Sequence, residues 1–146
     1  SGRTGTVNGA TRVAGARDRA LSFDGVDDYV HAGPWSVTGT SLTLCAWVRL
    51  ASPFQDNDAR LISKAVGIME PDHYWMLSIA VPSSQPRLRF RLKTGGSTTT
   101  LVAGSGDLAL DTWYHAAAVY DGSAMRLYLN GVEVGVGGEE RIALHG

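Results

Sequence analysis

The chain has 146 residues, 44% of them hydrophobic and 18% charged, with a formal net charge of −1 at pH 7. This length favours one domain with a sizeable core. The near-zero net charge provides no general attraction to nucleic acid or to anionic membrane surfaces. No apolar run approaches the ~20 residues of a spanning helix. We therefore expect a single domain over residues 1–146, with no nucleic-acid partner and no membrane insertion.

The first 32 residues predict an arm followed by two short strands. Residues 1–19 are rich in Gly, Thr and Arg and poor in large apolar groups, which predicts an irregular arm with a short strand near residues 5–8. Residues 20–23 and 29–32 are predicted to form two short strands on either side of a glycine turn. The arm is expected to be solvated.

Three carboxylates stand between these two strands, at Asp24, Asp27 and Asp28. Carboxylates around a glycine turn are ligands that Ca²⁺ accepts, so calcium is the cofactor that this segment suggests. The alternative is that Asp24 and Asp27 accept hydrogen bonds from turn amides. Trp35 follows in a loop, where its ring either stacks on a sugar or closes the end of a sandwich.

A long alternating strand is predicted over residues 41–50, followed by a loop at residues 52–58. The strand contains Cys45, the only cysteine, which excludes an internal disulfide. Its apolar neighbours predict a buried structural thiol. In the loop, Asp56, Asn57 and Asp58 offer polar contacts to a ligand. Another strand begins at residues 61–64.

The clearest hairpin joins residues 73–81 to residues 87–93 through a Pro-rich turn. In its second strand, apolar residues at 88, 90 and 92 predict a core-facing side. The opposite side carries a row of cations about 6.6 Å apart, two residues of strand rise: Arg87, Arg89, Arg91 and Lys93. Such a row either forms an ordinary solvated face or binds sulfate and carboxylate groups. Trp75, in the first strand, is a candidate platform for a sugar ring.

The end of the chain predicts a strand at residues 97–103, a loop at 104–111 and then three antiparallel strands. Trp113–Tyr120 alternates, a second alternation covers residues 125–130, and Val132–Val136 forms the third strand. Asn130-Gly131 is a strong signal for a two-residue hairpin turn, because both central positions need positive φ. Residues 141–144 suggest one further short strand. The whole chain is therefore expected to be all-β.

Two motifs resemble laminin-G-like domains of the concanavalin A-like lectin/glucanase group. One is Ala20–Val30, ALSFDGVDDYV. The other combines Trp113-Tyr114-His115, Val119–Gly122 and Leu127–Gly131. The resemblance covers roughly residues 5–137 and implies a two-sheet antiparallel β-sandwich, the jelly roll. It also implies a secreted or cell-surface location within a larger protein.

The function that this resemblance implies is binding of a poly- or oligosaccharide without catalysis. The cationic row suggests an acidic polysaccharide, and related domains often carry calcium. Glucanases of the group have an E-x-D-x-x-E strand that supplies two carboxylates. The nearest match, Glu70 to Trp75, has tryptophan in the third position and a proline in the strand. We therefore expect neither a glycoside hydrolase nor a lyase.

The chain departs from the family pattern at both ends, where the first and last strands of the family are not recognised. Those strands are neighbours in the family, and unpaired strand edges invite pairing with another chain. An assembly role is therefore the alternative function. The edge is expected to be covered by a second copy, by residues 1–13 or by a strand-completing partner. The same departure weakens the calcium prediction, because terminal strands commonly help to complete that site.

Overall fold

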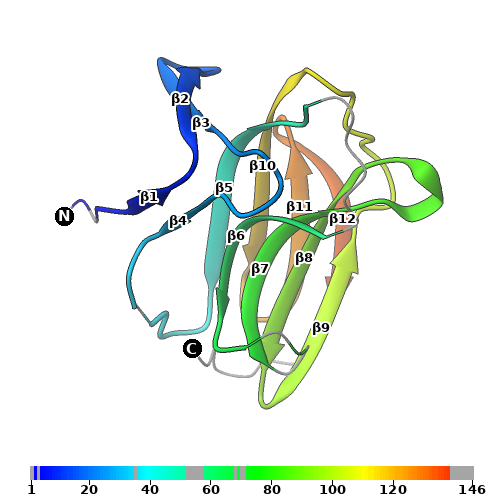
Figure 1. The fold of residues 1–146 in the computed structure, drawn as a ribbon. Helices are drawn as coiled ribbons and strands as arrows, with labels where there is room; N and C mark the ends of the chain where they lie inside the picture. Colours follow the sequence, from blue (N-terminus) through cyan, green and yellow to red (C-terminus); the bar gives the residue numbers. More distant parts are fainter. Residues whose placement is uncertain are drawn as a thin grey trace. The chain divides into compact units, whose positions relative to one another are not determined.

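The computed structural model describes residues 2, 4–34, 36–51, 58–67, 69 and 72–138. Two compact units divide the chain, residues 1–35 and residues 36–146. Apart from 3-10 turns such as η2 (Pro82–Ser84), the regular elements in the described part of the chain are strands (Figure 1), which confirms the all-β prediction. No helix among the described residues is long and apolar enough to cross a membrane.

The first unit consists of two separate antiparallel strand pairs. β1 (Thr6–Asn8) pairs with β4 (Tyr29–His31). β2 (Thr11–Ala14) pairs with β3 (Arg19–Ser22). The strands expected near residues 5–8, 20–23 and 29–32 are thus confirmed to within about two residues.

The irregular arm predicted over residues 1–19 is wrong for β2 and the start of β3. A tight turn joins these strands, with the Gly15 amide donating to the Asp18 carbonyl at 3.0 Å. A Cβ on Gly15 would lie 2.9 Å from the carbonyl carbon of Arg19, so the turn needs glycine there. Exposed strands held by backbone hydrogen bonds carry no apolar alternation, which is why the sequence pattern missed this hairpin.

The second unit is a sandwich of two four-stranded antiparallel sheets (Figure 1). One sheet has the strand order β12-β11-β10-β5 and the other β6-β7-β8-β9. Their bounds are β5 (Leu42–Arg49), β6 (Ala59–Ala65), β7 (His73–Ala80), β8 (Arg87–Thr94), β9 (Ser97–Val102), β10 (Trp113–Tyr120), β11 (Ala124–Leu129) and β12 (Val132–Gly138). The predicted hairpins and the final meander are confirmed. The strand proposed at residues 141–144 lies outside the described residues.

The core lies between these two sheets. β8 alternates strictly, so that Leu88, Phe90 and Leu92 have no exposed surface, while the residues between them are half-buried. The facing sheet contributes Ala116, Ala118 and Tyr120 from β10, which are also fully buried. In β8 and β10 this alternation removes one face of the strand from water, whereas β7 is buried on both faces, from Trp75 to Ala80.

The prediction for Cys45 is wrong, because its side chain is exposed. β5 buries Leu42, Leu44 and Val48 and turns Cys45 to the opposite side. The strand is also the end strand of its sheet among the described strands. An apolar segment does not show which of two alternating sets faces the core when both sets contain apolar residues.

Candidate functional site

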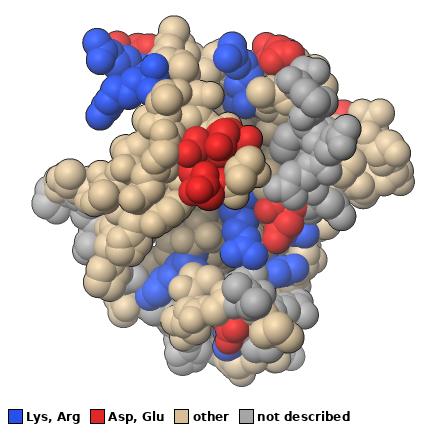
Figure 2. Space-filling view, viewed as in Figure 1, with Lys and Arg blue, Asp and Glu red and all other residues tan. Residues whose placement is uncertain are grey.

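The outer face of the β6–β9 sheet carries most of the cations that the sequence places together. Cross-strand register sets their positions, since Arg60, Ser78, Arg89 and Val102 form one row across the four strands. Met76 and Arg91 occupy the next row, and Lys93 pairs with Thr98 beyond it. The basic face is defined here as Arg60, Arg87, Arg89, Arg91 and Lys93. Blue Lys and Arg side chains are visible over this sheet in Figure 2.

Aspartates hold the cations at one end of the basic face. The Arg87 Nε donates to Asp107 Oδ1 at 2.5 Å, and its Nη1 donates to the Gly104 carbonyl at 3.0 Å. Arg89 binds Asp58 through one terminal nitrogen and donates to Ser78 Oγ at 3.0 Å through Nε. These bonds fix two guanidinium groups of the predicted row in defined orientations.

Of the three loop residues that were predicted to contact a ligand, Asp58 is the one that the structure describes. Its carboxylate bridges two cations. Besides Arg89 it contacts the Arg60 Nη2 at 3.4 Å. Its carboxylate is therefore engaged with the basic face, which makes it a positioning group for arginine. Asp56 and Asn57 lie outside the described residues, as does Trp35.

The other end of the basic face is organised around an aromatic ring. Tyr74 receives two ammonium groups, from Lys64 on β6 and from Lys93 on β8, each 5.5 Å from the ring centroid. Lys64 stands beside a register shift between β6 and β7, and its ammonium also donates to Ser36 Oγ at 3.4 Å. The sequence pattern grouped Lys93 with the arginines but did not show that Lys64 and Tyr74 join it.

Trp75 is not a ligand platform in this structure, which corrects that prediction. Its side chain is 2% exposed and belongs to the hydrophobic core between the sheets. Alternation along β7 placed Trp75 and Tyr74 on opposite faces, but it did not distinguish the core face from the outer one. Pairing of Trp75 with the buried Leu92 settles that choice.

Buried Ser78 is a contributor that sequence reasoning missed. It has no exposed surface although it lies on the outer side of β7, and its hydroxyl accepts the Arg89 hydrogen bond. A buried hydroxyl needs such a partner, so Ser78 and Arg89 satisfy each other. The sequence did contain a signal for this contact, namely a serine within an apolar strand next to a strand that carries cations.

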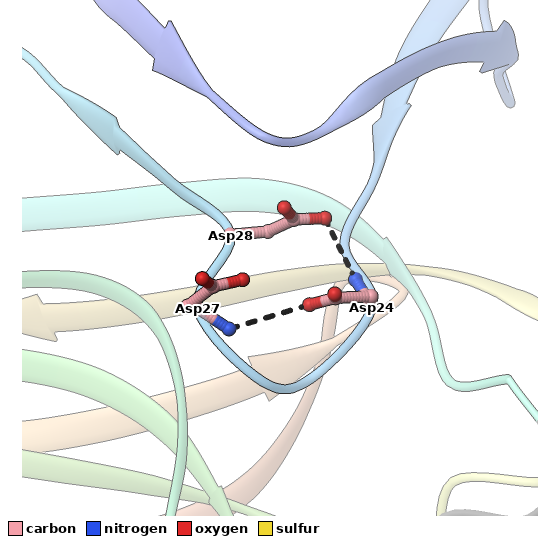
Figure 3. Close-up of side chains that lie close together, drawn as sticks. All are labelled: Asp24, Asp27 and Asp28. Carbon is pink, nitrogen blue, oxygen red and sulfur yellow. Dashed lines mark hydrogen bonds between the residues drawn. The ribbon is translucent and has the colours of Figure 1, made fainter.

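The three predicted metal ligands do lie together, in the first unit. One carboxylate oxygen from each of Asp24, Asp27 and Asp28 falls within a group no wider than 4.8 Å. Two of these carboxylates also accept amides of the turn. Asp24 Oδ1 accepts the Val26 amide at 2.8 Å. It also accepts the Asp27 amide at 3.4 Å, and Asp28 Oδ2 accepts the Asp24 amide at 2.9 Å (Figure 3). The hydrogen bond from the Val26 amide is the main cause that lowers the pKa of Asp24 below its ordinary value.

The carboxylate spacing fits a hard cation, and the hydrogen bonds fit the turn-capping alternative. Ca²⁺ takes six to eight oxygen ligands at about 2.3–2.6 Å. Carboxylate oxygens within 4.8 Å of one another suit one such ion. The metal interpretation is thus compatible with the geometry. The capping interpretation holds for Asp24, but the second carboxylate that accepts a turn amide is Asp28 and not the predicted Asp27, whose amide donates to Asp24.

Similarity to known proteins agrees with this architecture. Residues 24–143 match a laminin G family described as the concanavalin A-like lectin/glucanases superfamily. The chain is 31% identical to human (Homo sapiens) pappalysin-1 over 143 residues, which cover 92% of this chain and 9% of that protein. It is 39% identical to mouse (Mus musculus) pappalysin-1 over 131 residues, which cover 84% of this chain and 8% of that protein. The chain therefore spans less than a tenth of the length of these relatives.

The match and the two-sheet antiparallel sandwich lead to the same conclusion. This chain belongs to the laminin G-like family of the concanavalin A-like lectin/glucanases superfamily.

Proposed function

We propose that this domain is a non-catalytic carbohydrate-binding module whose basic face binds an acidic polysaccharide. The supporting observation is the grid of cations on one sheet face of a protein whose net charge is only −1. A local field of this kind attracts a polyanion although the whole molecule is nearly neutral. The rigid sheet also keeps the cations in place, which lowers the entropic cost of binding.

The absence of catalysis is part of the proposal. Glycoside hydrolysis uses two carboxyl groups about 5–9.5 Å apart, one of them a proton donor. On the basic face, the described carboxylates Asp58 and Asp107 each bind an arginine. A carboxylate whose oxygens are held by a guanidinium group is poorly placed to act on a glycosidic bond. Their arrangement supports binding more than bond cleavage.

Titration calorimetry with three matched oligosaccharides tests the proposal. We expect binding of a heparin-derived hexasaccharide or a galacturonate hexamer, and much weaker binding of neutral maltohexaose. Because exposed charges are screened by salt, affinity for the acidic sugars should fall steeply between 50 mM and 500 mM NaCl. Arg91→Gln should weaken binding of the acidic sugar by about tenfold, the usual value of one charge-assisted contact.

Arg49→Gln is the matched control. Arg49 also lies on a strand of the second unit, but its guanidinium stacks on Trp113 at 5.4 Å on the opposite sheet. This variant loses the same charge and should keep full affinity. Equal losses in both variants would show that net charge, not the basic face, attracts the sugar. Absence of salt-sensitive binding by the wild-type protein would reject the proposal.

An assembly role is the second candidate, and the position of β5 favours it. β5 is eight residues long and forms the end of its sheet among the described strands. Thr43, Cys45 and Trp47 on its outward side are all exposed. An end strand offers backbone hydrogen-bonding groups to an added strand. A second copy paired antiparallel near the middle of β5 would bring the two Cys45 thiols close together.

Light scattering and thiol cross-linking test this candidate. Pairing through β5 predicts a dimer that a mild oxidant converts to a Cys45–Cys45 disulfide, since facing residues of adjacent strands are close enough for that bond. Cys45→Ser should abolish the cross-link while the dimer remains. A monomer at all concentrations would exclude a homodimer. The assembly role would then require a different partner chain that adds a strand to β5.

Calcium assistance stays a prediction, with Asp24, Asp27 and Asp28 as the residues that would hold the ion. Bound calcium would offset the repulsion between three clustered carboxylates and raise the melting temperature. Thermal unfolding with calcium chloride and with EDTA measures this effect. A calcium-dependent rise that Asp27→Asn removes would support the site, whereas identical curves would leave turn capping as its role. The secreted or cell-surface location also stays a prediction.

A further inference from the structure

The hairpin of β2 and β3 in the first unit contains a hollow whose lining shares no residue with the basic face. Its volume is about 360 Å³, and two arginines, an aspartate and two small apolar residues line it: Arg12, Val13, Ala14, Asp18 and Arg19. Figure 2 shows arginine and carboxylate atoms together where Figure 1 places this hairpin. Ligand sites span about 300–1,000 Å³, so the hollow has room for a short segment of a chain. We call these five residues the hairpin hollow.

Strand register places Arg12 and Arg19 on the same side of the hairpin. Arg12 pairs with Leu21, and Ala14 pairs with Arg19, so the two arginines are diagonal neighbours across the strands. Diagonal neighbours are about 7–8 Å apart, within reach of long side chains. Both arginines are exposed and both line the hollow. One ligand in the hollow can therefore contact both of them.

These two arginines differ from those at the aspartate-bound end of the basic face. Among the described residues, neither Arg12 nor Arg19 has a hydrogen-bond or ion-pair partner. Like charges that are neighbours across two strands repel each other. An anion in the hollow would offset this repulsion and would meet guanidinium groups whose N–H donors are available for paired hydrogen bonds.

Asp18 adds an acceptor to these donors. Its φ is 60°, and its carbonyl accepts the Gly15 amide at 3.0 Å, which closes the turn between the two strands. Its exposed carboxylate lines the hollow. A ligand that satisfies this lining therefore needs an anionic group for the arginines and a hydroxyl donor for the aspartate. A sugar unit that carries a carboxylate or sulfate has both, whereas a polyanion without hydroxyl groups has only the first.

We propose that the hairpin hollow is a second binding site for the acidic polysaccharide. Arg12 and Arg19 take the carboxylate or sulfate of one sugar unit, and Asp18 accepts a hydrogen bond from a sugar hydroxyl. The small apolar side chains of Val13 and Ala14 suit the C–H groups of the ring. The proposal rests on the proposed polysaccharide function and gives the first unit a part in it.

Nuclear magnetic resonance can follow the two sites separately in the full 146-residue chain. The heparin-derived hexasaccharide and the galacturonate hexamer are each titrated into the ¹⁵N-labelled protein. We expect the amides of residues 12–19 to shift as well as those of residues 87–93, so that each group of signals gives its own affinity. The two sugars form separate arms, because one carries sulfate groups and the other carries carboxylates alone.

Charge-removing variants test the arginines of the hollow. Arg12→Gln and Arg19→Gln should each weaken binding at the hairpin by about tenfold and leave the affinity at residues 87–93 unchanged. Arg17→Gln is the matched control, because Arg17 belongs to the same hairpin but does not line the hollow. It removes the same charge and should keep the affinity. The amide spectrum of each variant shows that the protein is folded.

Asp18→Gly separates recognition of a sugar from attraction of a polyanion. Glycine adopts a φ of 60° without strain, so the turn is retained while the carboxylate is lost. Because the hairpin becomes more positive, its affinity for inorganic polyphosphate should rise. Its affinity for the acidic sugar should fall severalfold, since the sugar hydroxyl loses its acceptor. An unchanged or higher affinity for the sugar would overturn its assignment as the ligand of the hollow.

The remaining outcomes distinguish the hairpin hollow from the function on which it rests. Shifts confined to residues 87–93 would overturn the hairpin hollow and keep binding by the basic face. Shifts confined to residues 12–19 would keep the hairpin hollow and overturn the basic face as the binding surface. An equal loss of hairpin affinity in Arg12→Gln, Arg19→Gln and Arg17→Gln would overturn the hollow, because net charge would then explain the attraction. Shifts at neither site would overturn both.

Discussion

Asn130 shows how a single turn residue can be identified from sequence and then acquire a second role in the fold. Its φ of 50° and the φ of 80° at Gly131 are the positive values that the Asn-Gly pair predicted. The structure adds that Asn130 Oδ1 accepts the His115 amide at 2.8 Å, and that its own amide donates to the His115 carbonyl at 2.8 Å. The turn is thereby tied to β10, a contact that no local pattern shows.

Replacing Asn130 tests both roles. Asn130→Ala should lower the free energy of unfolding by about 1–2 kcal/mol, because alanine tolerates positive φ poorly and offers no side-chain acceptor. Asn130→Gly restores the backbone freedom but not the acceptor, so its loss should be smaller. Urea denaturation of the three proteins measures the difference. Equal stability in all three would show that neither feature matters to the folded state.

Asp121 is a second turn residue that is bound by another strand, through its ion pair with Arg126. Asp121 accepts a 2.5 Å hydrogen bond from Arg126 as well as the amides of Ala124 and Ser123, and Arg126 is the main cause that lowers its pKa strongly. The same contact raises the pKa of Arg126. Asp121-Gly122 interrupts the alternation of the sequence, but the sequence does not show that the cation that binds this carboxylate comes from the next strand, β11.

The pH dependence of unfolding tests this contact. A lowered carboxyl pKa contributes stability that is present above the unfolded value of about 3.9 and disappears as the pH falls toward the folded value. Wild-type protein should therefore lose stability more steeply below about pH 4 than Asp121→Asn, and should be the more stable of the two at pH 7. Because both groups are exposed, 0.5 M NaCl should reduce the gap. Parallel curves for the two proteins would contradict the assignment.

At Gly135, the close packing of β12 against a neighbouring segment imposes a constraint that the sequence pattern does not show. The last strand was predicted from alternating valines, and Gly135 was simply one of the intervening positions. In the structure β12 closes one side of the sandwich, with the Gly104 amide donating to the Val134 carbonyl at 2.9 Å. A Cβ at Gly135 would lie 3.1 Å from the Ala103 Cα, so the two backbones approach closely because no side chain intervenes.

A side chain at position 135 should therefore force the sheets apart. Gly135→Val is expected to destabilise the domain by about 1–3 kcal/mol, the usual cost of overpacking. Val136→Ala is a suitable comparison, because Val136 on the same strand is 59% exposed and its truncation should matter little. Chemical denaturation of both variants measures the effect. A larger loss in Val136→Ala would show that β12 packs differently.

At the scale of the whole chain, the hydrophobic core is confined to the second unit. Each member of the core cluster, including the partly buried residues packed on it, lies at position 37 or later. The described residues of the first unit include none that is fully buried. Short strands held mainly by backbone hydrogen bonds do not fold stably on their own in water. Whether one domain accounts for the entire chain, as its length suggested, stays a prediction.

Expressing the two units separately tests whether the second unit folds without the first. Residues 36–146 expressed alone should unfold cooperatively and keep the near-ultraviolet circular dichroism of buried Trp75 and Tyr120. A peptide of residues 1–35 should show no fixed structure by far-ultraviolet circular dichroism. Loss of the cooperative transition in the longer fragment would mean that the first 35 residues complete its packing. Such a result would favour the prediction that residues 1–13 cover a strand edge.

Local pattern was sufficient for the strands, the Asn-Gly turn, the core face of β8 and the family, because alternation and turn chemistry depend on neighbours along the chain. It was also sufficient to bring Arg87, Arg89, Arg91 and Lys93 onto one face. Packing and register alone decided that Trp75 is buried, that Cys45 is exposed and that Asp58 binds arginines. They also placed the ammonium groups of Lys64 and Lys93 near the ring of Tyr74, since contacts between different strands depend on how the sheet pairs.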